Sequence, residues 1–160
     1  MPGSSLWLVP PPSSPLSHIL RELITSTLPS HFPAETGAVT SPSTPTSLSP
    51  HFFPAHITLT SGISPETYGD DDPQAWLDSI PWPEEKPKVR FSGIESQDVF
   101  YRRCFIKVEL NEGVRKLAGL ARARGVIAPQ VGGDEGEVGK RVEEWLVQWE
   151  KAFGPHVSLM

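Results

Sequence analysis

Two short segments, 100 residues apart in the chain, share the same residue pattern. Each has a histidine, an aliphatic residue, a hydroxyl residue and a second aliphatic residue: His-Ile-Thr-Leu from His56, and His-Val-Ser-Leu from His156. Successive side chains of an extended strand point to opposite faces of a sheet. Each segment therefore predicts a strand with an imidazole and a hydroxyl on one face, His56 with Thr58 and His156 with Ser158, and aliphatic side chains on the other.

A single segment of this kind is more often an ordinary strand with a hydrated polar face, so one copy would not indicate function. The repetition is what favours function. Of the five histidines, only His56 and His156 are followed by an aliphatic residue, then Ser or Thr, then another aliphatic residue. A helical pattern and a proline precede each copy, which predicts two similar halves facing each other across a cleft. Thr60, on the same face as His56, is expected to be a bystander.

Two histidines that converge suit cleavage of a phosphate ester without a metal. A neutral imidazole, whose ordinary pKa is about 6.5, can accept a proton from water while a protonated one donates to the leaving oxygen. The hydroxyls of Thr58 and Ser158 would then bind the non-bridging phosphate oxygens. No Cys/His cluster has zinc-ligand spacing, and the acidic run at 70–72 lacks the spacing of a calcium loop, so we expect no metal and no cofactor. Which histidine is the base is left open.

The rest of the chain alternates between strand and helix patterns, which predicts the α+β class. Hydrophobic periodicity predicts further strands at 6–9, 89–94 and 99–110, and helices at 15–28, from Pro73 to about 80, at 111–124 and at 143–153. Pro29 and Gly125 are expected to end two of these helices, and 132–139 to form a glycine-rich loop. Residues 35–50 are dominated by Ser, Thr and Pro and are expected to form a flexible insertion.

Trp7 lies in the apolar segment Leu6–Val9, which three prolines follow. This pattern predicts a buried strand that ends in a stiff turn. Trp7 has two interpretations that the sequence leaves open: packing in the core, or a platform on which a nucleobase stacks at the mouth of a pocket.

Length and charge narrow the classes of partner. A chain of 160 residues can form a single domain with its own core, and we expect one domain over residues 1–160. The net charge of −5, with both signs mixed, argues against binding long nucleic acid but is compatible with a small nucleotide. The single cysteine, Cys104, excludes an internal disulfide, and no apolar run is long enough to span a membrane. We expect a soluble, intracellular and cytoplasmic monomer.

The two histidine segments resemble the paired motifs of the 2H phosphoesterases. The closer resemblance is to their eukaryotic cyclic phosphodiesterase branch in fungi and plants, whose first strand carries a W-x-x-P sequence, here Trp7 to Pro10. The P-H-V-S-L sequence at 155–159 is also similar to that branch. The resemblance implies a bilobal α+β fold in which two antiparallel sheets, flanked by helices, surround a central cleft.

The activity that the resemblance implies is metal-independent hydrolysis of nucleoside 2′,3′-cyclic phosphates to 2′-phosphates. It also implies hydrolysis of ADP-ribose 1″,2″-cyclic phosphate, a by-product of tRNA splicing, to ADP-ribose 1″-phosphate. Carried over by position, His56 and His156 become the acid–base pair, Thr58 and Ser158 bind the phosphate, and Trp7 stacks on the base.

The chain departs from the branch after the second motif. Members continue with an aromatic residue and further strands, whereas this sequence stops at Met160, so C-terminal strands are expected to be missing. Because chain ends fray unless neighbouring segments hold them, we expect the strand of His156 to be loosely held and activity to be weak or absent. The alternative functions are a catalytically impaired module that binds nucleotides or RNA ends and, less favoured, an interaction domain that uses the Ser/Thr/Pro-rich segment.

Overall fold

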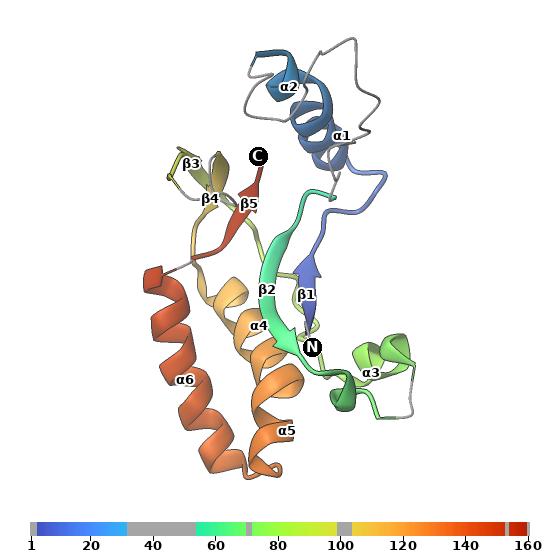
Figure 1. Cartoon of the computed structure of the whole chain (residues 1–160), viewed down its shortest axis with the longest axis vertical. Coiled ribbons are helices and arrows are strands. Elements are labelled where there is room, and N and C mark those ends of the chain that lie inside the picture. Colours follow the sequence, from blue (N-terminus) through green and yellow to red (C-terminus); the bar gives the residue numbers. More distant parts are fainter. Residues whose placement is uncertain (1–2, 32–53, 70–71, 99–103, 153, 160) are drawn as a thin grey trace, which may run out of the picture. The chain divides into compact units, whose positions relative to one another are not determined.

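The computed structural model of the chain describes residues 3–31, 54–69, 72–98, 104–152 and 154–159 (Figure 1). The insertion expected at 35–50 lies outside these residues. The chain divides into two compact units. The first contains Met1–Leu8, Thr58–Phe91 and Val108–Pro155, and the second contains Val9–Ile57, Ser92–Lys107 and His156–Met160.

The strands of the described residues form a single five-stranded sheet. Its order is β1 (Ser4–Leu8), β2 (Ile57–Ile63), β5 (His156–Ser158), β4 (Phe105–Val108) and β3 (Phe91–Glu95). β5 runs antiparallel to both β2 and β4. The α+β class is therefore confirmed. The expectation of two sheets is not confirmed: among the described residues, Ile57 of β2 pairs with Val157 of β5, and the strands form one sheet.

The core of the first unit lies where β2 meets two long helices, α4 (Glu112–Arg122) and α6 (Glu135–Ala152), which lie beside each other in Figure 1. Apolar stripes on both helices were expected from their periodicity, and the buried residues of this core are Leu59, Val114, Leu117, Ala118, Ala121, Leu146 and Trp149. Burying a large apolar side chain of this kind contributes about 1.5–3 kcal/mol. The expected cap is also present, since the Val114 N–H donates to Asn111 Oδ1 at 3.1 Å.

The first helical region differs from the expectation that Pro29 would end it. α1 (Pro15–Glu22) passes into a wider π-type turn, η1 (Leu23–Thr27), and the chain continues as α2 (Leu28–His31). The Leu28 N–H donates to the Leu23 carbonyl, five residues back. Pro29 directly follows this wider turn, a local departure from regular α-helical bonding of the kind found where the hydrogen-bond ladder is interrupted.

The same succession of α-helix, π-type turn and short α-helix occurs in the first unit. α4 passes into the π-type turn η4 (Ala123–Ile127) and then into α5 (Ala128–Val131), with Pro129 in its first turn. Gly125 therefore does not end the helix, as the sequence led us to expect. The end comes at Gly132, whose φ of 68° is a left-handed conformation that glycine adopts without strain.

The glycine-rich segment 132–139 is only partly a loop. α6 begins at Glu135, eight residues before the expected start at Glu143, so the second half of the segment is helical. Asp134 Oδ1 accepts a hydrogen bond from the Glu137 N–H at 3.0 Å, which satisfies one of the donors at the start of the helix. The acidic residues here thus serve the start of α6, where the helix dipole favours negative charge.

Two expected apolar segments are more exposed than their patterns indicated. In α1, Leu20 is the buried residue and Ile19 is 62% exposed, so this helix does not bury the wide stripe expected of a helix lying on a sheet. β1 buries Leu6 and Leu8 in part against the first unit's core, whereas Trp7 is 39% exposed. The helix α3 (Pro73–Ser79) begins where it was expected, and a short 3₁₀ helix, η2 (Pro65–Thr67), precedes it.

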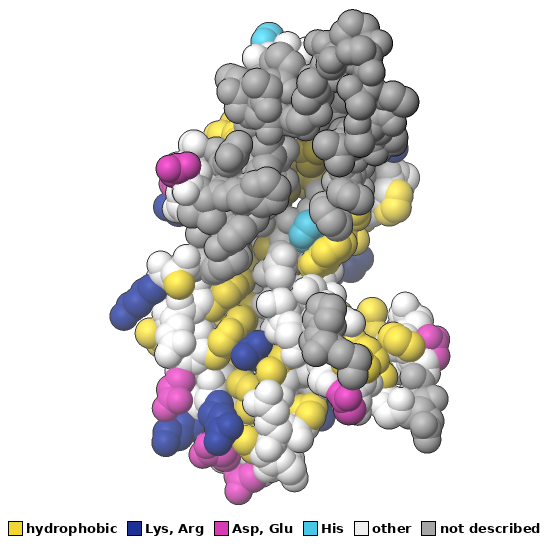
Figure 2. Space-filling model, viewed as in Figure 1, with side chains coloured by type: hydrophobic (Ala, Val, Ile, Leu, Met, Phe, Trp, Pro, Cys, Tyr) yellow, Lys and Arg dark blue, Asp and Glu magenta, His cyan; other side chains and the backbone are white. Residues whose placement is uncertain are grey.

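Charged side chains of both signs are interspersed over α6 on the face shown in Figure 2. Several are paired: Arg115 lies 2.7 Å from Glu143, and Arg141 lies 2.6 Å from Glu137 one turn away. Exposed pairs of this kind contribute little to stability, about 0–1 kcal/mol each. No helix in the described part of the chain is both long and apolar enough to cross a membrane.

Candidate active site

Strand pairing in the second unit determines where the two histidines lie. Ile57 and Val157 are partners across the antiparallel ladder, and both are buried. Residues directly opposite each other in a sheet share a face, and the residues on either side of them point to the opposite face. His56 precedes Ile57, and His156 and Ser158 flank Val157. All three side chains therefore lie on one face of two neighbouring strands, and each is half-buried.

Thr58 follows Ile57 in β2, and the alternation of the strand gives its half-buried side chain the same face as His56. Thr60 comes next on this face and is 2% exposed, and its hydroxyl has no hydrogen-bond partner among the described residues. Alternation thus puts the histidine and the hydroxyl residue of each motif on the same face of its own strand, while the aliphatic residues between them are buried.

β5 is held on both sides, contrary to the expectation that it would fray. Besides its pairing with β2, it pairs with β4 along its whole length: Phe105 with Ser158, Ile106 with Val157, and Lys107 with His156. The Leu159 N–H extends this ladder by donating to the Cys104 carbonyl at 2.9 Å. An interior strand that has partners on both edges is among the better-held parts of a sheet, and His156 lies at its start.

The orientation of the His56 ring follows from one hydrogen bond. Its Nδ1 lies 2.7 Å from the carbonyl oxygen of Pro54, two residues earlier. A carbonyl can only accept, so Nδ1 carries the hydrogen and donates it. The neutral ring then carries its hydrogen on Nδ1 and not on Nε2.

His156 is positioned by an aromatic neighbour that sequence reasoning did not assign to the site. The ring of Phe105 contacts the imidazole edge-on, with the ring centroids 5.4 Å apart and the planes at 70°. Phe105 is 1% exposed, so its own ring is fixed by packing. The sequence could have pointed to Phe105. Alternation in the strand expected at 99–110 places Phe105 on the polar face of that strand, which is the face that the histidine motifs share.

A lysine lies on the same face beside His156. Lys107 is the ladder partner of His156, and its Nζ forms an ion pair with Glu95 of β3 at 3.0 Å. Both charged side chains are about half-exposed, so water and salt screen this pair.

The remaining candidates from the sequence are Trp7 and Cys104. Trp7 is in β1 of the first unit, and its exposed side chain argues against the core-packing interpretation. Burial raises the pKa of the Cys104 thiol, which keeps the sulfur protonated and weakly nucleophilic. Among the described residues, no three His, Cys, Asp or Glu side chains are grouped so that they could hold a metal ion.

Comparison with known proteins agrees with the resemblance in the sequence. The family model described as "Cyclic phosphodiesterase-like protein" matches residues 1–160. A Neurospora crassa protein named 2′,3′-cyclic-nucleotide 3′-phosphodiesterase is 58% identical over 100% of this chain and 71% of its own length. Proteins of the same name from Phaeosphaeria nodorum and Yarrowia lipolytica are 40% and 26% identical, over 69% and 72% of their lengths. No solved structure gives a significant match. The chain belongs to the cyclic phosphodiesterase-like family.

Proposed function

We propose that this chain hydrolyses nucleoside 2′,3′-cyclic phosphates to nucleoside 2′-phosphates. The observation that carries the proposal is the placement of His56, His156 and Ser158 on one face of two paired strands, around the buried pair Ile57 and Val157. Two imidazoles in such an arrangement can act on one phosphate from two sides. The names of the fungal relatives support the substrate class.

The reaction requires one group that accepts a proton and a second group that donates one. One imidazole accepts a proton from water as the water oxygen bonds to phosphorus, and the other imidazole donates its proton to O3′ as the P–O3′ bond breaks. The phosphate stays on O2′. Each proton transfer contributes a factor of about 10²–10⁴ to the rate, and holding both groups in place contributes further.

The hydroxyls of Thr58 and Ser158 would stabilise the charge that develops on the non-bridging phosphate oxygens. A preorganised donor of this kind is worth about 3–4 kcal/mol in a water-excluded site. Because the two histidines and two hydroxyls supply both proton transfer and charge stabilisation, the proposed mechanism uses no metal.

The proposal also covers the contact with the base, a second substrate and the state in which the protein acts. Trp7 stacks on the base of the nucleotide. ADP-ribose 1″,2″-cyclic phosphate from tRNA splicing is a second substrate, because its five-membered cyclic phosphate presents the same bond to the two histidines. The protein acts on these small molecules as a cytoplasmic monomer.

The alternative, a module that binds nucleotides without turnover, depended on a loosely held His156. The pairing of β5 with both β2 and β4 favours the enzyme over this alternative.

The test is hydrolysis of cytidine 2′,3′-cyclic phosphate in excess EDTA. We expect turnover in the wild type, and a loss of at least about 10³-fold in kcat for His56→Ala and for His156→Ala, because each removes one proton transfer. His31→Ala, which removes an exposed histidine at the end of α2, is the matched control and should keep wild-type activity. Turnover abolished by EDTA, or retained by His56→Ala, would contradict the proposal.

A further inference from the structure

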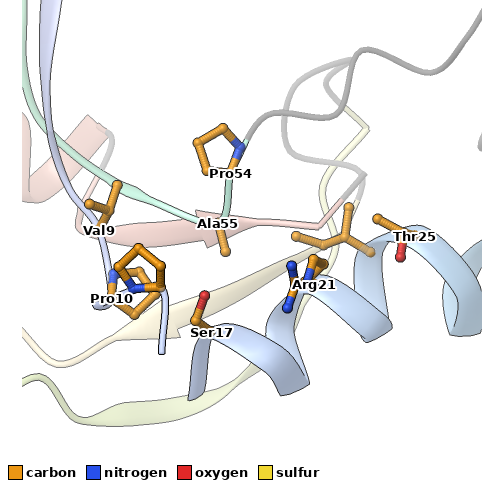
Figure 3. A pocket seen from close by; sticks show the side chains of 9 residues that line it. Val9, Pro10, Ser17, Arg21, Thr25, Pro54 and Ala55 are labelled. Carbon is orange, nitrogen blue, oxygen red and sulfur yellow. The ribbon is translucent and has the colours of Figure 1, made fainter. Parts of the chain in front are cut away.

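A pocket lies within the second unit, and two residues of its wall, Pro54 and Ala55, directly precede His56 in the chain. It has a volume of about 400 Å³, inside the range of about 300–1,000 Å³ that is usual for small-molecule sites. Three parts of the chain line it: the proline-rich segment after β1, one side of α1 and η1, and the segment Pro54–Ala55 that leads into β2 (Figure 3).

The helical side of the pocket supplies its polar groups. Ser17 and Arg21 are four residues apart in α1 and so lie on the same side of the helix, and Figure 3 shows both projecting toward Pro10 and Ala55. Thr25 adds a second hydroxyl from the following turn. The opposite walls are proline and aliphatic side chains. Arg21 is the one charged residue among those that line the pocket, and no carboxylate is among them.

The guanidinium of Arg21 is suited to an anion. Its Nη2 donates to His18 Nδ1 at 2.6 Å, and among the described residues it forms no ion pair with a carboxylate. A guanidinium has five N–H donors in a rigid fork that matches phosphate geometry. The bond to His18 fixes the side chain and leaves most of these donors for a ligand.

The pocket and the site share one short segment. The Pro54 carbonyl that orients His56 belongs to a residue of the pocket wall, and Ala55, also in the wall, directly precedes His56. A ligand whose cyclic phosphate lies against His56 and whose sugar extends toward Ala55 would carry its next group into this pocket.

We propose that the pocket binds a second anionic group of the substrate, a phosphate or pyrophosphate on the 5′ side of the ribose, and that Arg21 is its ligand. The inference rests on the proposed function for the position of the cyclic phosphate. It makes nucleotides that carry both a cyclic and a 5′-phosphate better ligands than those that carry the cyclic phosphate alone.

The experiment measures binding of two product-type nucleotides to the full chain by calorimetry: cytidine 2′-phosphate and cytidine 2′,5′-bisphosphate. We expect the wild type to bind the bisphosphate about tenfold more tightly, the effect of one charge-assisted contact at an exposed site. In Arg21→Gln the two nucleotides should bind within about twofold of each other. Arg124→Gln, which removes an exposed arginine outside the pocket, is the control and should keep the tenfold ratio.

Equal affinity of the wild type for the two nucleotides, or no binding of the bisphosphate, would overturn the inference. So would a tenfold preference that persists in Arg21→Gln, since the second phosphate would then bind elsewhere. Neither measurement needs turnover. A failure to hydrolyse the cyclic nucleotide therefore counts against the proposed function alone, and a missing preference counts against the pocket alone.

Discussion

At the scale of single residues, the two histidines are held by different means. His56 is oriented by a hydrogen bond to the backbone at Pro54, and His156 by an edge-on contact with the buried ring of Phe105. Both neighbours touch the imidazoles and not the reacting atoms, so each acts by positioning a proposed catalytic group. Small errors in such positioning are costly, because proton transfer depends on near-ideal geometry.

Phe105→Leu tests the positioning role. It keeps an apolar side chain but removes the ring edge, so we expect kcat for the cyclic nucleotide to fall about tenfold with little change in KM. Ile106→Val is the control: Ile106 is buried on the opposite face, so it should lower stability by about 1 kcal/mol and leave kcat unchanged. Both variants are assayed at a temperature where circular dichroism shows them folded. An unchanged kcat in Phe105→Leu would show that the contact only fills space.

At the scale of elements, local sequence signals predicted where helices lie but not where they end. Pro29 and Gly125 are ordinary helix breakers, and both expectations failed for one reason. A π-type turn supplies hydrogen bonds five residues back, and the helix then restarts around the proline. In the second case tertiary packing favours the continuation, because Gly125 lies against the fully buried side chain of Ile63. That contact joins residues distant in sequence, so no local pattern could reveal it.

Two glycine substitutions test this account of η4. A Cβ at position 125 would lie 2.9 Å from Ile63 Cγ1, so Gly125→Ala should lower the free energy of unfolding by about 1–3 kcal/mol. Gly139→Ala is the matched control within α6, where a Cβ meets no atom within 4 Å. It should raise that free energy by about 0.5–1 kcal/mol. Urea unfolding followed by circular dichroism measures both, and equal effects of the two substitutions would refute the close contact.

At the scale of the whole molecule, the sequence indicated which residues share a face but not which strands are neighbours. Alternation within each motif is local, and it placed His56 with Thr58 and His156 with Ser158. The pairing of β5 between β2 and β4 depends on register between segments 100 residues apart, which neither motif specifies. The sequence led us to treat the last residues as a loose end, whereas β5 is paired on both edges. The pocket beside Arg21 was missed because three separate segments form it.

The central claim is that two histidines on one sheet face act as an acid–base pair, and the pH dependence of kcat/KM for cytidine 2′,3′-cyclic phosphate tests it most directly. One imidazole must be neutral and the other protonated, so the wild type should give a bell-shaped profile with a limb on each side of its maximum between about pH 5 and 8. His56→Ala and His156→Ala should each remove one limb from the residual activity. A wild-type profile that is flat across this range, or that keeps both limbs after either substitution, would contradict the claim.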